Sequence, residues 1–147
     1  MMTAIDILTK DHRKVAALFD EIERADDRGS IFRQIFDELT VHSEAEETFF
    51  YPELELSSET SGEVAHSYHE HKEVKELLAD LAARDPNDAE FMSVMKELRQ
   101  NVEHHVQEEE GELFPKAVEV LGEAKLADIG TKIQALKKSK QSNKRAA

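Results

Sequence analysis

Four long segments of this chain place apolar residues at alternating spacings of three and four, the pattern of helices that pack along a common seam. Clusters of turn-forming residues at 26–30, 57–62 and 84–88 separate the segments. Four helices with short connections favour an all-α fold, an antiparallel up-down-up-down four-helix bundle. A weaker break at 120–125 precedes a short amphipathic stretch, so we also expect a short C-terminal helix.

The chain is long enough for one domain with a single core, which we place at residues 1–137. The segment that remains, residues 138–147, is polar and basic. Short basic ends of this kind are usually solvated and frayed, so we expect a disordered tail there.

Composition narrows the classes of partner. The net charge of −13 argues against nucleic acid, because binding to phosphates needs a basic surface. The chain has no cysteine, which excludes disulfides and thiolate metal sites. No apolar run approaches membrane-spanning length and the N-terminus lacks the pattern of a signal peptide, so we expect no membrane association and a cytoplasmic location. The sequence leaves the oligomeric state open.

Polar residues interrupt each apolar seam. A histidine falls on every seam, and a glutamate follows four residues later on the second and fourth; the six residues are His12, His42, Glu46, His71, His105 and Glu109. The two halves of the chain also repeat. Residues 42–52 align with 105–115 at an offset of 63, and residues 11–22 align with 70–81 at an offset of 59. Two such hairpins packed with approximate two-fold symmetry would bring all six side chains together in the core.

Two glutamates on buried seams require a compensating charge. Ionised carboxylates are almost never buried without a partner, because desolvation costs several kcal/mol for each. No lysine or arginine lies on the seams at that level, so the charge must come from protonated histidines or from metal ions. Metal ions fit better, since imidazole and carboxylate are common ligands of iron, manganese and zinc. His and Glu four residues apart lie on one helix face, about 6 Å apart along the axis.

Charge and ligand number favour two ions. Four neutral histidines and two glutamates carry −2, and two divalent ions would add +4, much of which a bridging oxide or hydroxide would remove. Six protein ligands do not fill two octahedral ions, so open positions should remain for small oxygen-derived ligands. Iron is favoured over zinc, because four ligands usually satisfy zinc. We therefore predict a cofactor of two non-haem iron ions.

Polar residues beside the seams have simpler interpretations. The simplest interpretation of Asp11 and Glu70 is that they are surface charges. We expect four further residues to face solvent or at most to contact a residue of the site: His66, His69, His104 and Glu108. Glu47 and Glu110 repeat across the halves and could either hydrogen-bond the ligand histidines or face water. Tyr51 could contribute to the site as a hydrogen-bond donor or as a ligand, although ordinary packing is the simpler interpretation.

The residues named above resemble the hemerythrin-like, HHE cation-binding domain. The matching residues are His12 in "DHRKV", His42 and Glu46 in "HSEAEE", His71 in "EHKEV", and His105 and Glu109 in "HHVQEEEGELFP". The resemblance covers residues 3–120. It implies a binuclear non-haem iron centre in a four-helix bundle, with both glutamates bridging the ions.

The chain departs from the oxygen-carrying hemerythrins at two places. Ser67 stands where they have a further histidine one turn before the third-helix ligand, and the fourth helix has His-x-x-x-Glu in place of their His-x-x-x-x-Asp. The resemblance therefore implies, instead of reversible oxygen carriage, a protein that reacts with or senses peroxide, oxygen or nitric oxide under oxidative or iron stress.

Several functions are compatible with such a site. One is an enzyme with catalase-like decomposition of peroxide, although no catalytic residue can be named from the sequence. Another is a non-catalytic sensor or store of oxygen, nitric oxide or iron that acts with a separate partner. A ferritin-like protein is disfavoured, because that class uses Glu-x-x-His and more glutamates. A metal-free interaction module would leave the two seam glutamates unexplained.

Overall fold

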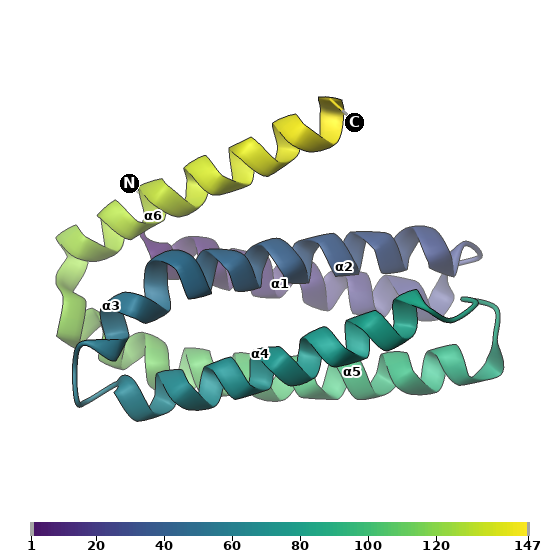
Figure 1. The fold of residues 1–147 in the computed structure, drawn as a ribbon, viewed down its shortest axis with the longest axis horizontal. Coiled ribbons are helices and arrows are strands. Elements are labelled where there is room, and N and C mark those ends of the chain that lie inside the picture. Colours follow the sequence, from purple (N-terminus) through teal and green to yellow (C-terminus); the bar gives the residue numbers. More distant parts are fainter. Residues whose placement is uncertain (1, 147) are drawn as a thin grey trace.

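The computed structural model describes the backbone of residues 2–146 and the side chains of residues 2–143. Within this range every regular element is a helix, and four long helices pack antiparallel in an elongated bundle (Figure 1). These helices are α1 (Ala4–Arg24), α2 (Arg28–Ala45), α4 (Ser61–Ala82) and α5 (Ala89–Glu108). The predicted all-α four-helix bundle is confirmed. No helix in the described range is both long enough and apolar enough to cross a membrane.

Helices α2, α4 and α5 begin within or directly after the predicted turn clusters, and polar side chains cap the first turns of α1 and α2. Thr3 and Asp6 form a reciprocal capping box at the start of α1, in which each side chain accepts from the backbone N–H of the other residue. The carboxylate of Asp27 accepts from the N–H of Ser30, 3.1 Å away, and caps α2. Short capped connections keep consecutive helices adjacent and antiparallel.

Two π-helical turns continue the helices that carry the glutamates. The elements that complete the fold are η1 (Glu46–Phe50), α3 (Tyr51–Glu55), η2 (Glu109–Leu113) and α6 (Phe114–Ala146). The π-helical turn η1 extends α2, η2 extends α5, and each begins at a seam glutamate. In each turn a backbone N–H bonds the carbonyl five residues earlier, Tyr51 to Glu46 and Phe114 to Glu109. Each turn therefore accommodates one more residue than an α-helix does.

The extra residue changes which side chains face the core after each glutamate. A constant spacing of three or four residues on the second seam would place Phe49 in the core after Glu46, but the structure does not. Phe49 is half-buried, whereas Phe50 and Tyr51 are fully buried. One additional residue rotates the following helix by roughly 100°. Tyr51 reaches the bundle interior for this reason.

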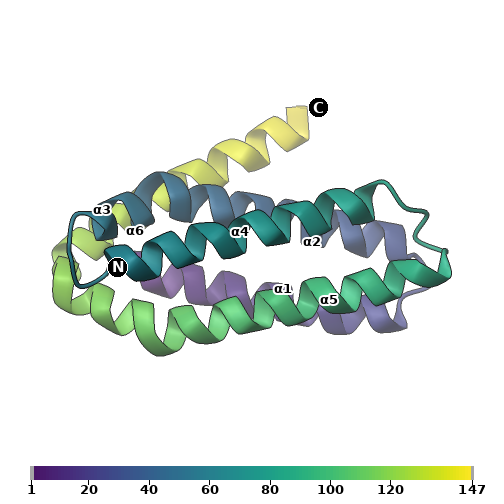
Figure 2. The same cartoon turned by 60° about the horizontal axis from the view of Figure 1, so that its bottom comes forward.

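Helix α6 breaks and returns along the outside of the bundle. Gly122, with a φ of 79° that favours glycine, interrupts the helix within the expected break at 120–125. Beyond it Leu126, Ile129 and Ile133 are buried, as the expected short C-terminal helix requires. Figures 1 and 2 show this part (yellow) on the side of α1 and α2, away from α4 and α5. The helix continues to Ala146, and disorder of residues 138–147 stays a prediction.

A polar layer divides the apolar core into two clusters. One cluster lies toward the α1–α2 and α4–α5 loops and includes Phe19, Ile35 and Phe91. The other lies toward α3 and the bend of α6 and includes Leu8 and Phe50. The predicted histidines and glutamates occupy the level between them.

Close backbone contact between α6 and the start of α1 depends on Gly130. A Cβ atom there would lie 2.6 Å from the carbonyl oxygen of Met2 and 2.9 Å from the carbonyl carbon of Thr3. We expect Gly130→Ala to lower the free energy of unfolding by about 1–3 kcal/mol, measured by urea denaturation. Gly62→Ala is the matched control, because nothing lies within 4 Å of its added Cβ. The control should leave stability unchanged or raise it by up to about 1 kcal/mol; equal stability of the two variants would contradict this account of α6.

Candidate metal centre

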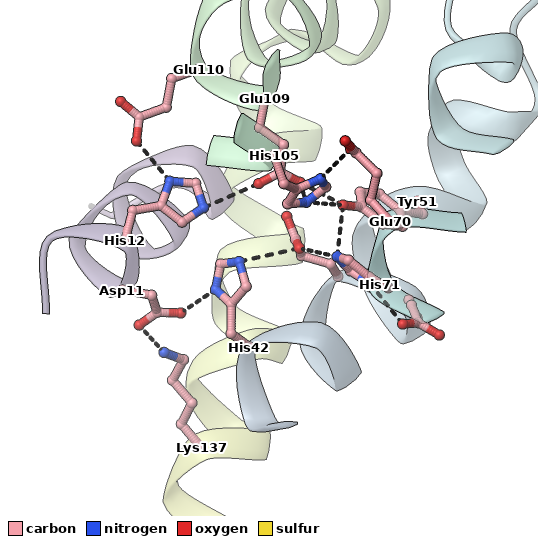
Figure 3. A network of polar contacts seen from close by, with 12 residues as sticks. Asp11, His12, His42, Tyr51, Glu70, His71, His105, Glu109, Glu110 and Lys137 are labelled. Atoms are coloured by element: carbon pink, nitrogen blue, oxygen red, sulfur yellow. Dashed lines mark hydrogen bonds and ion pairs between the residues drawn. The ribbon is translucent and has the colours of Figure 1, made fainter. Parts of the chain in front are cut away.

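The six residues predicted from the seams meet in the polar layer (Figure 3). One histidine comes from each long helix, and each glutamate is the first residue of a π-helical turn. All six side chains are buried: His12, His42, Glu46, His71, His105 and Glu109. The structure thus brings together side chains that lie up to 97 residues apart in the sequence.

Both glutamates are shared between two groups of four side chains. His12 and His42 belong to the first group, and His71 and His105 belong to the second. Within each group the ligand-type atoms lie within 4.8 Å of one another. Such spacing is compact enough for a cation to bind among the side chains of a group.

Each carboxylate lies between one imidazole of each group. The Nε2 atoms of His42 and His71 are both 3.1 Å from Oε1 of Glu46. The Nε2 atoms of the other two histidines lie 3.1 and 3.3 Å from the two oxygens of Glu109. The polar layer therefore has the approximate two-fold symmetry that the sequence repeat predicts.

Further carboxylates contact the second ring nitrogen of every buried histidine. Each Nδ1 lies 2.7–2.9 Å from a carboxylate oxygen, in the pairs His12–Glu110, His42–Asp11, His71–Glu47 and His105–Glu70. A carboxylate partner favours the proton on Nδ1, which leaves the Nε2 lone pair directed at the centre of the layer. The four contacts thus orient the four rings toward the centre of the polar layer.

Two of these carboxylates were misjudged from the sequence. Asp11 and Glu70 are not the expected surface charges, since both are buried against a histidine of another helix. For Glu47 and Glu110, contact with histidine is the correct one of the two alternatives. Asp11 also accepts from the amine of Lys137, which joins α6 to the layer (Figure 3). The sequence repeat could have indicated this contact with histidine, because Asp11 and Glu70 each directly precede a seam histidine.

Tyr51 gives one group a hydroxyl that the other group lacks. Its Oη donates to Oε2 of Glu109 at 2.5 Å and lies 3.3 Å from Nε2 of His71. The equivalent residue in the repeat is Phe114, which stacks on His12 with ring centroids 5.8 Å apart. Burial, together with the charge of Glu109, raises the pKa of Tyr51 well above its usual value, so the hydroxyl keeps its proton. Ordinary packing therefore does not account for Tyr51, because its hydroxyl donates a hydrogen bond within the polar layer.

The three remaining histidines are exposed, as predicted. The exposed fractions of their side chains are 54% for His66, 69% for His69 and 65% for His104. Glu108, also expected at the surface, is one-third exposed. Burial thus separates the four histidines of the polar layer from the others.

Five atoms of the polar layer are buried without a hydrogen-bond partner. They are Nε2 of His12, Nε2 of His42, both carboxylate oxygens of Glu46 and Oε1 of Glu109. The imidazole Nε2 atoms of His12 and His42 approach carboxylate oxygens to 3.1 Å but are not aligned for hydrogen bonding. Atoms that all point at a common position between them have this geometry. Each unsatisfied buried group costs about 1–3 kcal/mol. A cation would satisfy all of them, so the donor set is suited to a metal site.

Without a cation, protons balance the charge of the glutamates. Burial disfavours the imidazolium form, but the charge of Glu46 and the contacts of the ring with Asp11 and Glu46 together outweigh burial and raise the pKa of His42 to about 10. The pKa values of His71 and His105 are raised against the same opposing effect of burial, by the adjacent glutamates. Burial likewise disfavours ionisation of Glu109, but His105 holds the pKa of Glu109 well below its usual value. A cation that binds here must displace the histidine protons.

The metal-free protein should lose stability as the pH rises. The raised pKa of His42 stabilises the folded state fully below the unfolded value of about 6.5, and this contribution is lost as the pH rises through the folded value of about 10. We expect the melting temperature of chelator-treated protein to fall between these pH values, measured by calorimetry. Glu46→Gln removes the charge that raises the pKa and should flatten the curve. A wild-type melting temperature that rises over this range would contradict the charge balance described here.

Comparison with known proteins agrees with this geometry. The hemerythrin HHE cation-binding domain family matches residues 3–117 of the chain. The crystal structure of a hemerythrin HHE cation-binding domain-containing protein from Mycobacterium kansasii matches with a TM-score of 0.84 and 24% identity. The match covers 97% of this chain and 90% of that one, and it shows that the two share a fold.

Two relatives are more similar in sequence. A DNA nickase of Nostoc sp. is 37% identical over 116 residues, which are 77% of this chain but 33% of the relative, so the chain spans a third of that protein. A hemerythrin-like protein of Schizosaccharomyces pombe is 32% identical over 143 residues, which are 93% of this chain and 70% of the relative. The family match and this second relative both extend over most of the chain, which therefore belongs to the hemerythrin HHE cation-binding domain family.

Proposed function

We propose that the chain binds two iron ions in the polar layer and uses them to react with small oxygen-derived molecules, hydrogen peroxide foremost. The observation that carries this proposal is the pair of four-residue groups that share both glutamates and direct unpartnered atoms at one another. We propose as ligands the residues predicted from the sequence: His12, His42, Glu46, His71, His105 and Glu109. When bound, iron would exchange electrons with an oxygen species, a reaction that the side chains cannot perform.

The residues around the layer would prepare it for that chemistry. The carboxylates on the Nδ1 atoms orient the imidazoles and increase their basicity as ligands. Tyr51 holds a proton on Oη beside the second group, whereas Phe114 offers none beside the first. A small molecule would therefore meet a proton donor on one side only, the side of Tyr51.

A small cavity supplies a route to this side. A cavity of about 200 Å³ lies between α4 and η2, and its lining includes Ser67 and Glu109. Ser67 is buried, one turn before His71, where the oxygen-carrying hemerythrins have a further histidine. The small serine side chain leaves space that an imidazole would fill. That space, about the size needed for several waters, admits peroxide.

Catalase-like decomposition is the reaction that we favour. One peroxide is oxidised to oxygen and gives up two electrons and two protons, and a second peroxide takes these up and leaves as two waters. The expected cytoplasmic location fits, because a reducing compartment keeps iron available as the divalent ion. The alternative is a non-catalytic sensor or store of oxygen, nitric oxide or iron, which would bind the same ligands without turnover.

We do not propose for this chain the DNA-nicking activity that the name of the Nostoc relative describes. That protein is about three times longer than the matched part, and DNA cleavage can belong to its other regions. The net charge of −13 also disfavours association of this chain with a phosphate backbone. We therefore propose no nucleic-acid function.

Loss of a shared glutamate should abolish the binuclear centre. We expect wild-type protein expressed with iron to contain about two ions per chain, and Glu46→Ala and Glu109→Ala to lose most of this metal, measured by elemental analysis. His69→Ala is the matched control, because His69 is exposed and contacts only Glu73 among the carboxylates. Two irons retained by both glutamate variants would overturn the ligand assignment. Iron-loaded wild type should also melt at a higher temperature than metal-free protein.

Peroxide turnover separates the enzyme from the sensor. We expect the iron-loaded protein to release oxygen from hydrogen peroxide, measured with an oxygen electrode, and Tyr51→Phe to lower the rate by about 100-fold with iron content unchanged. The reason is that the variant removes the proton donor but keeps the ring. Tyr68→Phe is the control, since this half-buried tyrosine packs edge-on against Tyr51 outside the layer. Iron-loaded protein without turnover would support the sensor or store instead.

A further inference from the structure

A second cluster of metal-ligand side chains lies at the surface beside the polar layer. His66 and Glu70 of α4 and Glu108 of α5 place ligand-type atoms within 4.8 Å of one another. Nε2 of His66 lies 3.1 Å from Oε2 of Glu108 and 3.4 Å from Oε2 of Glu70. Nε2 of His104 lies 2.7 Å from the other oxygen of Glu108 and closes the cluster on its outer side.

The repeat shows that the fold itself does not require this cluster. The offsets of 59 and 63 place Ile7, Val41 and Ala45 in the first half where the second half has His66, His104 and Glu108. Ile7 and Ala45 are buried, in the same apolar cluster as Leu126 and Ile129 of α6. Helix α6 does not cover the equivalent positions in the second half, so polar residues are needed there. All three residues found there, His66, His104 and Glu108, are of types that ligate metals.

The cluster stands at the mouth of the cavity that reaches the polar layer. His66 and Glu108 line this cavity together with Ser67 and Glu109, so the cavity extends from the surface cluster to a shared glutamate. Glu63 and Glu112 also line it. Lys116 pairs with Glu63, but the carboxylates of the lining outnumber this one cation, so the entrance is acidic. An acidic entrance raises the local concentration of cations.

Glu70 joins the cluster to the proposed centre directly. One oxygen, Oε1, lies 2.7 Å from Nδ1 of His105, and the other, Oε2, faces His66 (Figure 3 shows the first contact). Its equivalent in the first half, Asp11, has Lys137 on its second oxygen instead. In the first half, the ammonium group of Lys137 thus pairs permanently with the carboxylate. In the second half, His66 faces the equivalent carboxylate, and a metal ion can bind between them and exchange with solvent.

We propose that His66, Glu70 and Glu108 bind a divalent transition-metal ion and capture it at the mouth of the cavity before it enters the polar layer. One imidazole and two carboxylates suit iron, manganese and zinc in the divalent state, and the exposed position leaves sites for water. The surface site is independent of the proposed function, whereas its role in capture rests on that function. An ordinary cluster of ion pairs has no need of a metal ion. Metal binding is therefore the measurement that distinguishes the proposed site from such a cluster.

Manganese binding tests the surface site. We expect iron-loaded protein to bind one further Mn²⁺ per chain, seen as loss of the free-ion signal in electron paramagnetic resonance, with the iron content unchanged. His66→Ala and Glu108→Gln should each weaken this binding at least tenfold. His69→Ala is the matched control, because His69 forms the same kind of exposed pair with Glu73 on α4 but has no third ligand. Absence of a further Mn²⁺, or equal binding by wild type and both variants, would overturn the site.

Iron uptake by metal-free protein tests the capture role. We expect His66→Ala to slow uptake of Fe²⁺ about tenfold, as loss of a local cation trap should, with the same final iron content as wild type. Uptake is followed by the loss of Fe²⁺ accessible to a colorimetric chelator, and His69→Ala should match wild type. Unchanged uptake by a variant that has lost Mn²⁺ binding would overturn the capture role. Failure of the wild type to retain iron would instead contradict the proposed function. The comparison of Mn²⁺ binding by wild type, His66→Ala, Glu108→Gln and the control would then be made on metal-free protein and would still decide the surface site.

Discussion

Burial of two carboxylates between two apolar clusters is the constraint on which the rest of this structure depends. Among the side chains that the structure describes, no lysine or arginine pairs with Glu46 or Glu109. Four imidazoles surround the two glutamates instead, and four further carboxylates contact the imidazoles. Such an arrangement is costly unless positive charge enters it, either as protons or as cations. The bundle supplies rigid helices on all sides, which keep the ligand atoms in place while that charge is exchanged.

The approximate two-fold symmetry of the layer stops at its surroundings. Helix α6 covers the side of His12 and His42, where Lys137 and Phe114 close the site. The side of His71 and His105 instead has a phenol, a serine and an acidic cavity. A repeated sequence thus gives two similar groups of buried His and Glu side chains, and the residues that differ between the halves give these groups different surroundings.

The sequence predicted the bundle, its turns and the six central residues, because seam spacing and the cost of a buried carboxylate are local and strong signals. The sequence did not predict the π-helical turns. The seam pattern assumes constant spacings of three and four residues, and such a pattern cannot reveal one extra residue within a helix. Tyr51 was left open for that reason. Asp11 and Glu70 were misjudged because a charge beside a seam normally faces water, and only the neighbouring helix shows that each contacts a histidine. The ions themselves stay a prediction.

The two π-helical turns have a consequence for the history of the chain. Both begin at the glutamate of a His-x-x-x-Glu sequence, and both are followed by an aromatic residue and a proline at the same offset. Insertions within helices are rarely tolerated, because they rotate every later side chain away from its partners. If the halves arose by duplication, a single insertion in the ancestral hairpin accounts for both turns. The irregularity would then be older than the differences between Tyr51 and Phe114, which diverged on a backbone that was already bent.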